Sequence, residues 1–130
     1  LEDAGFDAGR DLAGESHAVA SAWHARTELI AALHRVHREH RLSRGAFKTA
    51  LAQFVADSES DLFDWLPLTE SVHQRALRVF RKAPATAYLR SADALHLACA
   101  AEHGFAQIYS NDRHLLSAAP LFGLEGVNIL

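Results

Sequence analysis

The chain has 130 residues, of which 49% are hydrophobic and 22% are charged, a composition that fits one globular domain and excludes a wholly disordered chain. No apolar run reaches the roughly 18 to 20 residues needed to cross a bilayer, and no signal peptide is evident. The formal net charge of −3 argues against a protein that binds nucleic acid through a broad excess of positive charge.

Charge and cysteine usage add two local expectations. Residues 1–15 hold five acids and one base, whereas residues 73–90 hold five bases and no acid, and residues 34–48 hold five further bases. Either these two basic segments hold a short anionic ligand, or they are the solvated faces of two helices. The single cysteine, Cys99, has no partner in the chain, which favours a reducing, cytoplasmic setting.

The first half of the chain alternates short apolar strands with helices. Apolar residues at three- and four-residue spacing predict the buried face of each helix. In chain order we expect a strand at 17–23, a helix at 22–40, a helix at 44–56, a strand at 61–68 and a helix from 70 to about 82. Ser21, Ser43 and Thr69 are the expected N-caps of these three helices.

The second half continues the alternation. The segment 92–103 is apolar on nearly all sides, as expected for a helix packed between layers, with Ser91 as its N-cap and Gly104 as its C′ residue. A strand at 105–110, a short helix at 113–119 and a last strand at 126–130 follow. Strands that alternate with helices predict a three-layer α/β/α sandwich around a central parallel sheet, formed by a single domain over residues 1–130.

Three carboxylates border buried segments of this predicted fold. Glu28 lies near the start of a helix, Asp93 begins the apolar helix in "RSADALHL", and Asp112 ends the strand in "IYSNDRHLL". Taken singly, Asp93 fits a first-turn carboxylate that favours the helix dipole, and Asp112 fits a helix cap. Taken together at the carboxyl edge of a parallel sheet, they fit a site for Mg²⁺ or Mn²⁺, which prefer oxygen ligands.

These motifs resemble a known family. "RSADALHLACAAEHG" followed by "IYSNDRHLL" is similar to the C-terminal half of PIN domains, especially VapC-type toxin ribonucleases. "VASAWHARTELIAALHR" is similar to the segment of that family in which a helix carries a second acidic residue. The resemblance implies a PIN-like α/β/α sandwich that cleaves single-stranded RNA with Mg²⁺ or Mn²⁺.

The resemblance also implies roles for particular residues and partners. Glu28, Asp93 and Asp112 would be catalytic and metal-binding, while Ser110, Asn111 and Arg113 would contact a ligand water or the substrate phosphate. The protein would be the toxin of a toxin–antitoxin pair. It would form a homodimer, and a small cognate antitoxin would hold it inactive.

One departure from the family concerns the first strand. In PIN domains this central strand ends in the first catalytic aspartate, and none of Asp3, Asp7 or Asp11 follows an apolar strand here. The chain also contains no methionine. We therefore expect the chain to be truncated at its N-terminus, with the first strand supplied by upstream residues.

Three alternatives remain open from the residues. The domain is either catalytic or a non-catalytic PIN-like interaction domain that kept the fold and lost the chemistry. His34, His37 and His40 form either a metal cluster or a solvated basic helix end. Arg35 and His40 also have the spacing of a metal-independent ribonuclease, although the predicted strands disagree with its all-helical HEPN fold.

Overall fold

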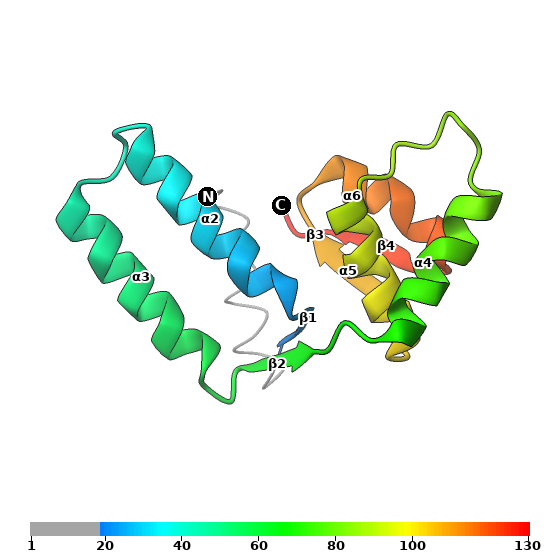
Figure 1. Cartoon of the computed structure of the whole chain (residues 1–130), viewed down its shortest axis with the longest axis horizontal. Helices are drawn as coiled ribbons and strands as arrows, with labels where there is room; N and C mark the ends of the chain where they lie inside the picture. The colour runs from blue at the N-terminus through cyan, green and yellow to red at the C-terminus, as the bar shows by residue number, and fades with distance from the viewer. Residues whose placement is uncertain (1–18) are drawn as a thin grey trace. The chain divides into compact units, whose positions relative to one another are not determined.

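A computed structural model gives the mixed α/β fold expected from the sequence, and it describes residues 19–130 (Figure 1). Within that range the chain forms five α-helices, one 3₁₀ helix and four short strands. The chain divides into two compact units at Trp65 and Leu66. The prediction of a single domain over 1–130 stays a prediction.

The described part of the first unit is a pair of strands and a pair of helices. The strands are β1 (Val19–Ala22) and β2 (Phe63–Leu66), which pair with each other. The helices are α2 (His24–Arg38) and α3 (Arg44–Ser58), which pack side by side (Figure 1). The buried residues of these helices are Leu33 and Val36 of α2 and Phe54 of α3, which lie on the apolar faces that the spacing predicts.

The second unit is built around one buried helix. The helices are α4 (Glu70–Lys82), α5 (Ser91–Glu102), α6 (Arg113–Ala118) and the 3₁₀ helix η1 (Ala119–Phe122). α5 packs against α4, η1 and β3. Its residues Leu97, Ala98 and Cys99 are fully buried, which explains why this helix is apolar on nearly all sides.

The strands of the second unit form a parallel pair. β3 (Gln107–Ser110) aligns with β4 (Glu125–Asn128), with Ser110 opposite Asn128. A parallel pair requires a crossover, and α6 with η1 supplies it. The prediction of parallel strands joined by helices is confirmed here. Within residues 19–130 the strands form two two-stranded sheets, β1–β2 and β3–β4.

The helix caps confirm three sequence predictions and contradict two. Ser43 and Thr69 accept hydrogen bonds from the backbone N–H groups of Ala46 and Val72, and Gly104 has the left-handed φ of +84° that a C′ residue adopts. Ser21 is not a cap because it belongs to β1, and α2 begins later, at His24. The predicted cap at Ser91 is likewise wrong.

Candidate metal centre

Asp112 is held at the carboxyl end of β3 by three local hydrogen bonds. Its own N–H donates to Ser110 Oγ over 2.9 Å, which closes the turn that leaves the strand. Its Oδ1 then accepts from the N–H of His114 at 2.9 Å and of Leu115 at 3.4 Å, so Asp112 is the N-cap of α6. Only Oδ1 takes part in capping, which leaves Oδ2 for a partner of opposite charge.

Asp93 lies in the first turn of α5. The cap position of this helix is taken by Arg90, whose backbone is extended (φ −82°, ψ 156°), and Ser91 is already helical. Asp93 is therefore three residues after the cap, where a negative charge faces the positive end of the helix dipole. Its side chain is 13% exposed, so its carboxylate requires a compensating group.

Arg90 joins the two carboxylates. Its Nε donates to Asp93 Oδ2 over 2.8 Å, and one terminal nitrogen lies 2.8 Å from that same oxygen. The same terminal nitrogen donates to Asp112 Oδ2 over 3.1 Å. One carboxylate oxygen from α5 and one from the cap of α6 thus converge on a single positive charge.

The electrostatics of this group favour the charged state of the arginine. The pKa of Arg90 is raised above its ordinary value, first by the hydrogen bond to Asp93 and then by the negative charges of Asp93 and Asp112. The Arg90 side chain is nevertheless 49% exposed. It can therefore leave the carboxylates for solvent without disturbing the buried core.

An aromatic pair lies beside the arginine. The Tyr88 ring packs against His114 with ring centroids 4.2 Å apart, and the Arg90 guanidinium lies 5.6 Å from the Tyr88 ring centre. This is within the range of a cation–π contact. The segment before α5 and the first turn of α6 are thus joined by stacking as well as by charge.

Two of the three predicted metal ligands lie together within the second unit. Asp93 and Asp112 meet at Arg90, while Glu28 lies on α2 in the first unit, where its Oε1 is 3.6 Å from His24 Nε2. Asp3, Asp7 and Asp11 lie outside the described residues.

The three predicted substrate-binding residues flank Asp112. Ser110 and Asn111 precede it and are half-buried, and Arg113 follows it and is exposed. The Ser110 hydroxyl accepts from the N–H of Asp112, and its carbonyl accepts from the N–H of Ile129 at 3.2 Å. Ser110 therefore shapes the turn that presents Asp112.

The histidines at the end of α2 have structural contacts. His37 Nδ1 lies 2.9 Å from the Leu42 carbonyl oxygen, and its ring stacks on Phe47 with centroids 5.0 Å apart. His34 meets the same phenylalanine edge-on at 6.2 Å. His40 has a positive φ of 61° and stands just past the end of α2. These contacts favour a helix end that packs on α3 over a cluster of metal ligands.

The sequence analysis placed Arg90 only in the basic segment 73–90 and not beside the two aspartates. The signal was its place three residues before Asp93, since residues three apart at a helix start can form an ion pair. Its second contact, to Asp112, depends on how α5 and α6 pack and has no signature in the local sequence.

Comparison with known proteins identifies a family for almost the whole chain. The family model described as PIN domain matches residues 4–120. No curated protein and no solved structure matches the chain. The matched range includes Glu28, Asp93 and Asp112.

Proposed function

The chain belongs to the PIN domain family, a nuclease-type fold, and we propose on that premise that it is a metal-dependent ribonuclease that hydrolyses single-stranded RNA. One observation carries the proposal: Asp93 Oδ2 and Asp112 Oδ2 both bind the guanidinium of Arg90. PIN domains are generally nucleases that use divalent cations, so a nucleic acid is the expected substrate class.

The two aspartates fit a divalent cation. They offer hard oxygen ligands from two different elements, and both oxygens already converge on one cationic group. Because the capping bond to α6 uses Oδ1 of Asp112, Oδ2 would be the atom that holds a cation. Glu28 is the proposed third acidic ligand. When bound, Mg²⁺ or Mn²⁺ supplies acidification of a water and charge stabilisation at the leaving oxygen.

The protein's own residues have distinct tasks in this proposal. Asp93 and Asp112 would hold the cation, and Ser110 fixes the turn that orients Asp112. Asn111 and Arg113, on either side of Asp112, orient the scissile phosphate. Arg90 balances one of the two negative charges of Asp93 and Asp112, and it would have to leave them for these residues to hold a cation.

The proposed biological role is that of a toxin in a toxin–antitoxin pair. It is supported by the likeness of "RSADALHL" and "SNDRHLL" to VapC-type toxins. On this proposal the protein is cytoplasmic and forms a homodimer, and a small antitoxin inhibits it. Within residues 19–130, no helix is both long and apolar enough to span a bilayer.

The test is cleavage of single-stranded RNA by the full-length protein. We expect cleavage in Mn²⁺ or Mg²⁺, none in EDTA, and a loss of at least about 100-fold in Asp93→Asn, in the range typical for removing a charge-stabilising group. Arg113→Gln, which leaves both aspartates in place, should cleave more slowly but keep its dependence on metal. Cleavage that survives both EDTA and Asp93→Asn would contradict the proposal and favour Arg35 and His40.

A second candidate function is favoured by the same ion pair. Because Arg90 already pairs with both Asp93 and Asp112, the arrangement also suits a non-catalytic PIN-like interaction domain in which the arginine permanently replaces the metal. Such a protein would neither bind Mn²⁺ nor cleave RNA.

A further inference from the structure

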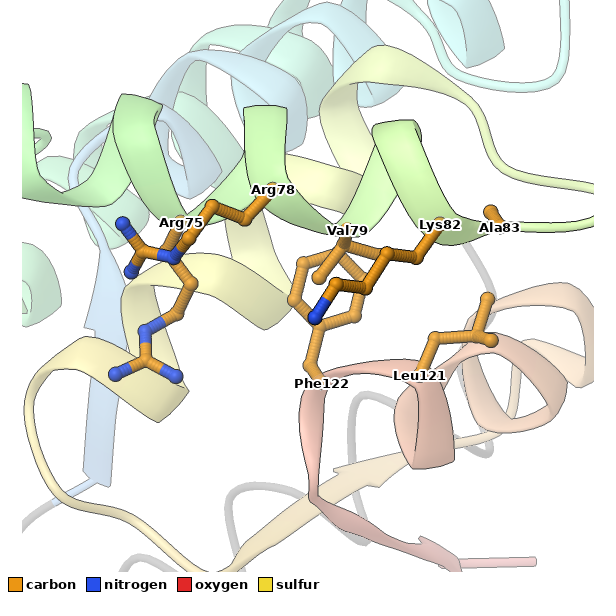
Figure 2. A pocket seen from close by; sticks show the side chains of 7 residues that line it. All are labelled: Arg75, Arg78, Val79, Lys82, Ala83, Leu121 and Phe122. Atoms are coloured by element: carbon orange, nitrogen blue, oxygen red, sulfur yellow. The ribbon is translucent and has the colours of Figure 1, made fainter.

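A basic pocket lies between α4 and η1 in the second unit. It has a volume of about 240 Å³ and is lined by four apolar and three cationic side chains, namely Val79, Ala83, Leu121, Phe122, Arg75, Arg78 and Lys82 (Figure 2). The lining contains no acidic residue. Figure 2 shows Leu121 and Phe122 pointing from η1 toward α4, which carries the three cations.

The charge in this pocket is only partly balanced by the protein. Arg75 donates from Nε to Glu102 Oε2 over 2.6 Å, so one of the three cations is paired. This hydrogen bond, together with the positive charges of Arg75 and Arg78, lowers the pKa of Glu102 and keeps that partner ionised. Two further positive charges, Arg78 and Lys82, line the pocket one helical turn apart on α4.

The spacing of these two cations has a cost. Like charges four residues apart destabilise a helix by a few tenths of a kcal/mol. An anion bound between them would remove that repulsion. Arg78 and Lys82 are both exposed, so salt screens their attraction for an anion. Phe122 beside them is only 6% exposed and belongs to the apolar floor of the pocket.

The size of the pocket limits the ligand. At about 240 Å³, it is smaller than the ~300 Å³ at which pockets begin to enclose a whole drug-sized ligand. One phosphate with its sugar is a suitable occupant. The guanidinium of Arg78 can bind phosphate oxygens through two parallel N–H groups, and Lys82 adds a point charge.

We propose that this pocket is a subsite for one phosphodiester of single-stranded RNA, held by Arg78 and Lys82 with its sugar against Leu121 and Phe122. The proposal rests on the proposed ribonuclease function and extends it to a second contact on the same strand, separate from the two aspartates. An acidic peptide is the competing occupant, and the experiment distinguishes the two.

The experiment measures binding of a short 2′-O-methyl RNA oligonucleotide to the full-length protein at several salt concentrations. EDTA is present, so that no metal-dependent cleavage occurs. We expect the Arg78→Ala/Lys82→Ala variant to bind the oligonucleotide more weakly than the wild type. The slope of the logarithm of the association constant against the logarithm of the salt concentration should be smaller in magnitude by about 0.7, because one phosphate of a single strand contributes that amount. The loss should be similar for all oligonucleotide sequences, because a phosphate carries no sequence information.

The matched control removes two positive charges that lie outside the pocket. Arg81→Ala/Lys48→Ala takes one exposed arginine from α4 and one exposed lysine from α3, neither of which lines the pocket. Its salt slope should equal that of the wild type. An equal fall in the slope of both double variants would overturn the subsite, because it would reflect overall charge alone.

Two further readouts complete the test. If an oligoglutamate peptide binds the wild type but not Arg78→Ala/Lys82→Ala, while RNA binding is the same in both, the occupant is a peptide and the proposal is wrong. Cleavage in Mn²⁺ separates the two proposals. If the wild type cleaves RNA but Arg78→Ala/Lys82→Ala binds RNA as well as the wild type does, only the subsite proposal is wrong. If RNA binding depends on Arg78 and Lys82 but the wild type does not cleave RNA, only the proposed ribonuclease function is wrong.

Discussion

Asp112 uses its two carboxylate oxygens for different purposes. The sequence offered a helix cap and a metal ligand as alternative interpretations of this residue. In the structure Oδ1 accepts the capping bonds from α6, and Oδ2 faces Arg90. Capping is therefore compatible with cation binding, since it consumes only one oxygen and orients the other.

Arg90 should compete with a divalent cation. We predict that Arg90→Gln binds Mn²⁺ roughly five- to tenfold more tightly than the wild type, because the competing positive charge is lost. The same variant should unfold more easily in EDTA, where Asp93 and Asp112 are left without a partner. Titration calorimetry and urea unfolding would measure the two effects.

Arg113→Gln is the control for this prediction. It removes an exposed arginine next to Asp112 and leaves the ion pairs of Arg90 in place. It should bind Mn²⁺ with nearly wild-type affinity. Equal gains in Mn²⁺ affinity in both variants would show that overall charge, and not the position of Arg90, sets the affinity.

At the element scale, the contact between β4 and α6 depends on a glycine. A Cβ on Gly126 would lie 3.0 Å from Leu116 Cδ2, 3.1 Å from the Leu116 carbonyl oxygen and 3.2 Å from its Cα. Because two of these atoms belong to the backbone, they cannot move aside easily. The close approach brings α6, and with it the cap at Asp112, directly onto the sheet.

Gly126→Ala should therefore destabilise the protein by about 1–3 kcal/mol, the usual cost of overpacking. Gly45→Ala is the matched control, because a Cβ there meets no atom within 4 Å and the residue lies in α3. It should stabilise the protein by about 0.4–1 kcal/mol. Urea unfolding would measure both, and a Gly126→Ala variant as stable as the wild type would contradict the predicted overpacking.

Elements with strong local signals were predictable from the sequence. Ser43, Thr69 and Gly104 act where their short-range chemistry indicates. The prediction that Ser91 is the N-cap of α5 was wrong, because either of two adjacent residues could take that position. The side chain of Arg90 gains its ion pairs when Arg90 is the cap. Local propensity does not include such tertiary contacts, so helix starts are predictable only to within a few residues.

At the scale of the whole molecule, an ion pair makes stability depend on pH. Arg75 on α4 binds Glu102 at the end of α5, and that hydrogen bond lowers the pKa of Glu102. A lowered carboxyl pKa stabilises the fold above the ordinary carboxyl range, and the contribution is lost as the pH falls through the lowered value. The pair therefore stabilises the packing of α4 on α5 at neutral pH.

Glu102→Gln should lower the free energy of unfolding at neutral pH, and its difference from the wild type should shrink in acid. Urea unfolding at a series of pH values would measure this difference. Glu59→Gln, at an exposed carboxylate that follows α3, is the control and should show little difference at any pH. If the difference in free energy of unfolding between Glu102→Gln and the wild type grew in acid, the stabilisation would not come from the ionised pair.

The candidate site was only partly predictable from the sequence. Asp93 and Asp112 were predictable because a helix start and a strand end in an α/β fold bring both residues to one edge. Arg90 was not, because its link to Asp112 spans 22 residues and depends on tertiary packing. The role of Glu28 stays a prediction, as do the homodimer and the antitoxin.

The central claim is that Asp93 and Asp112 bind one divalent cation together. The most direct measurement is Mn²⁺ binding, by titration calorimetry, to the full-length wild type, Asp93→Asn, Asp112→Asn and the double variant. Asparagine keeps the shape of each side chain and the capping ability at residue 112 while removing the charge. We predict that each single variant loses most of the affinity and that the double variant loses little more, because residues that share one ion act as a unit. Wild-type affinity in both single variants, or no Mn²⁺ binding by the wild type, would contradict the claim.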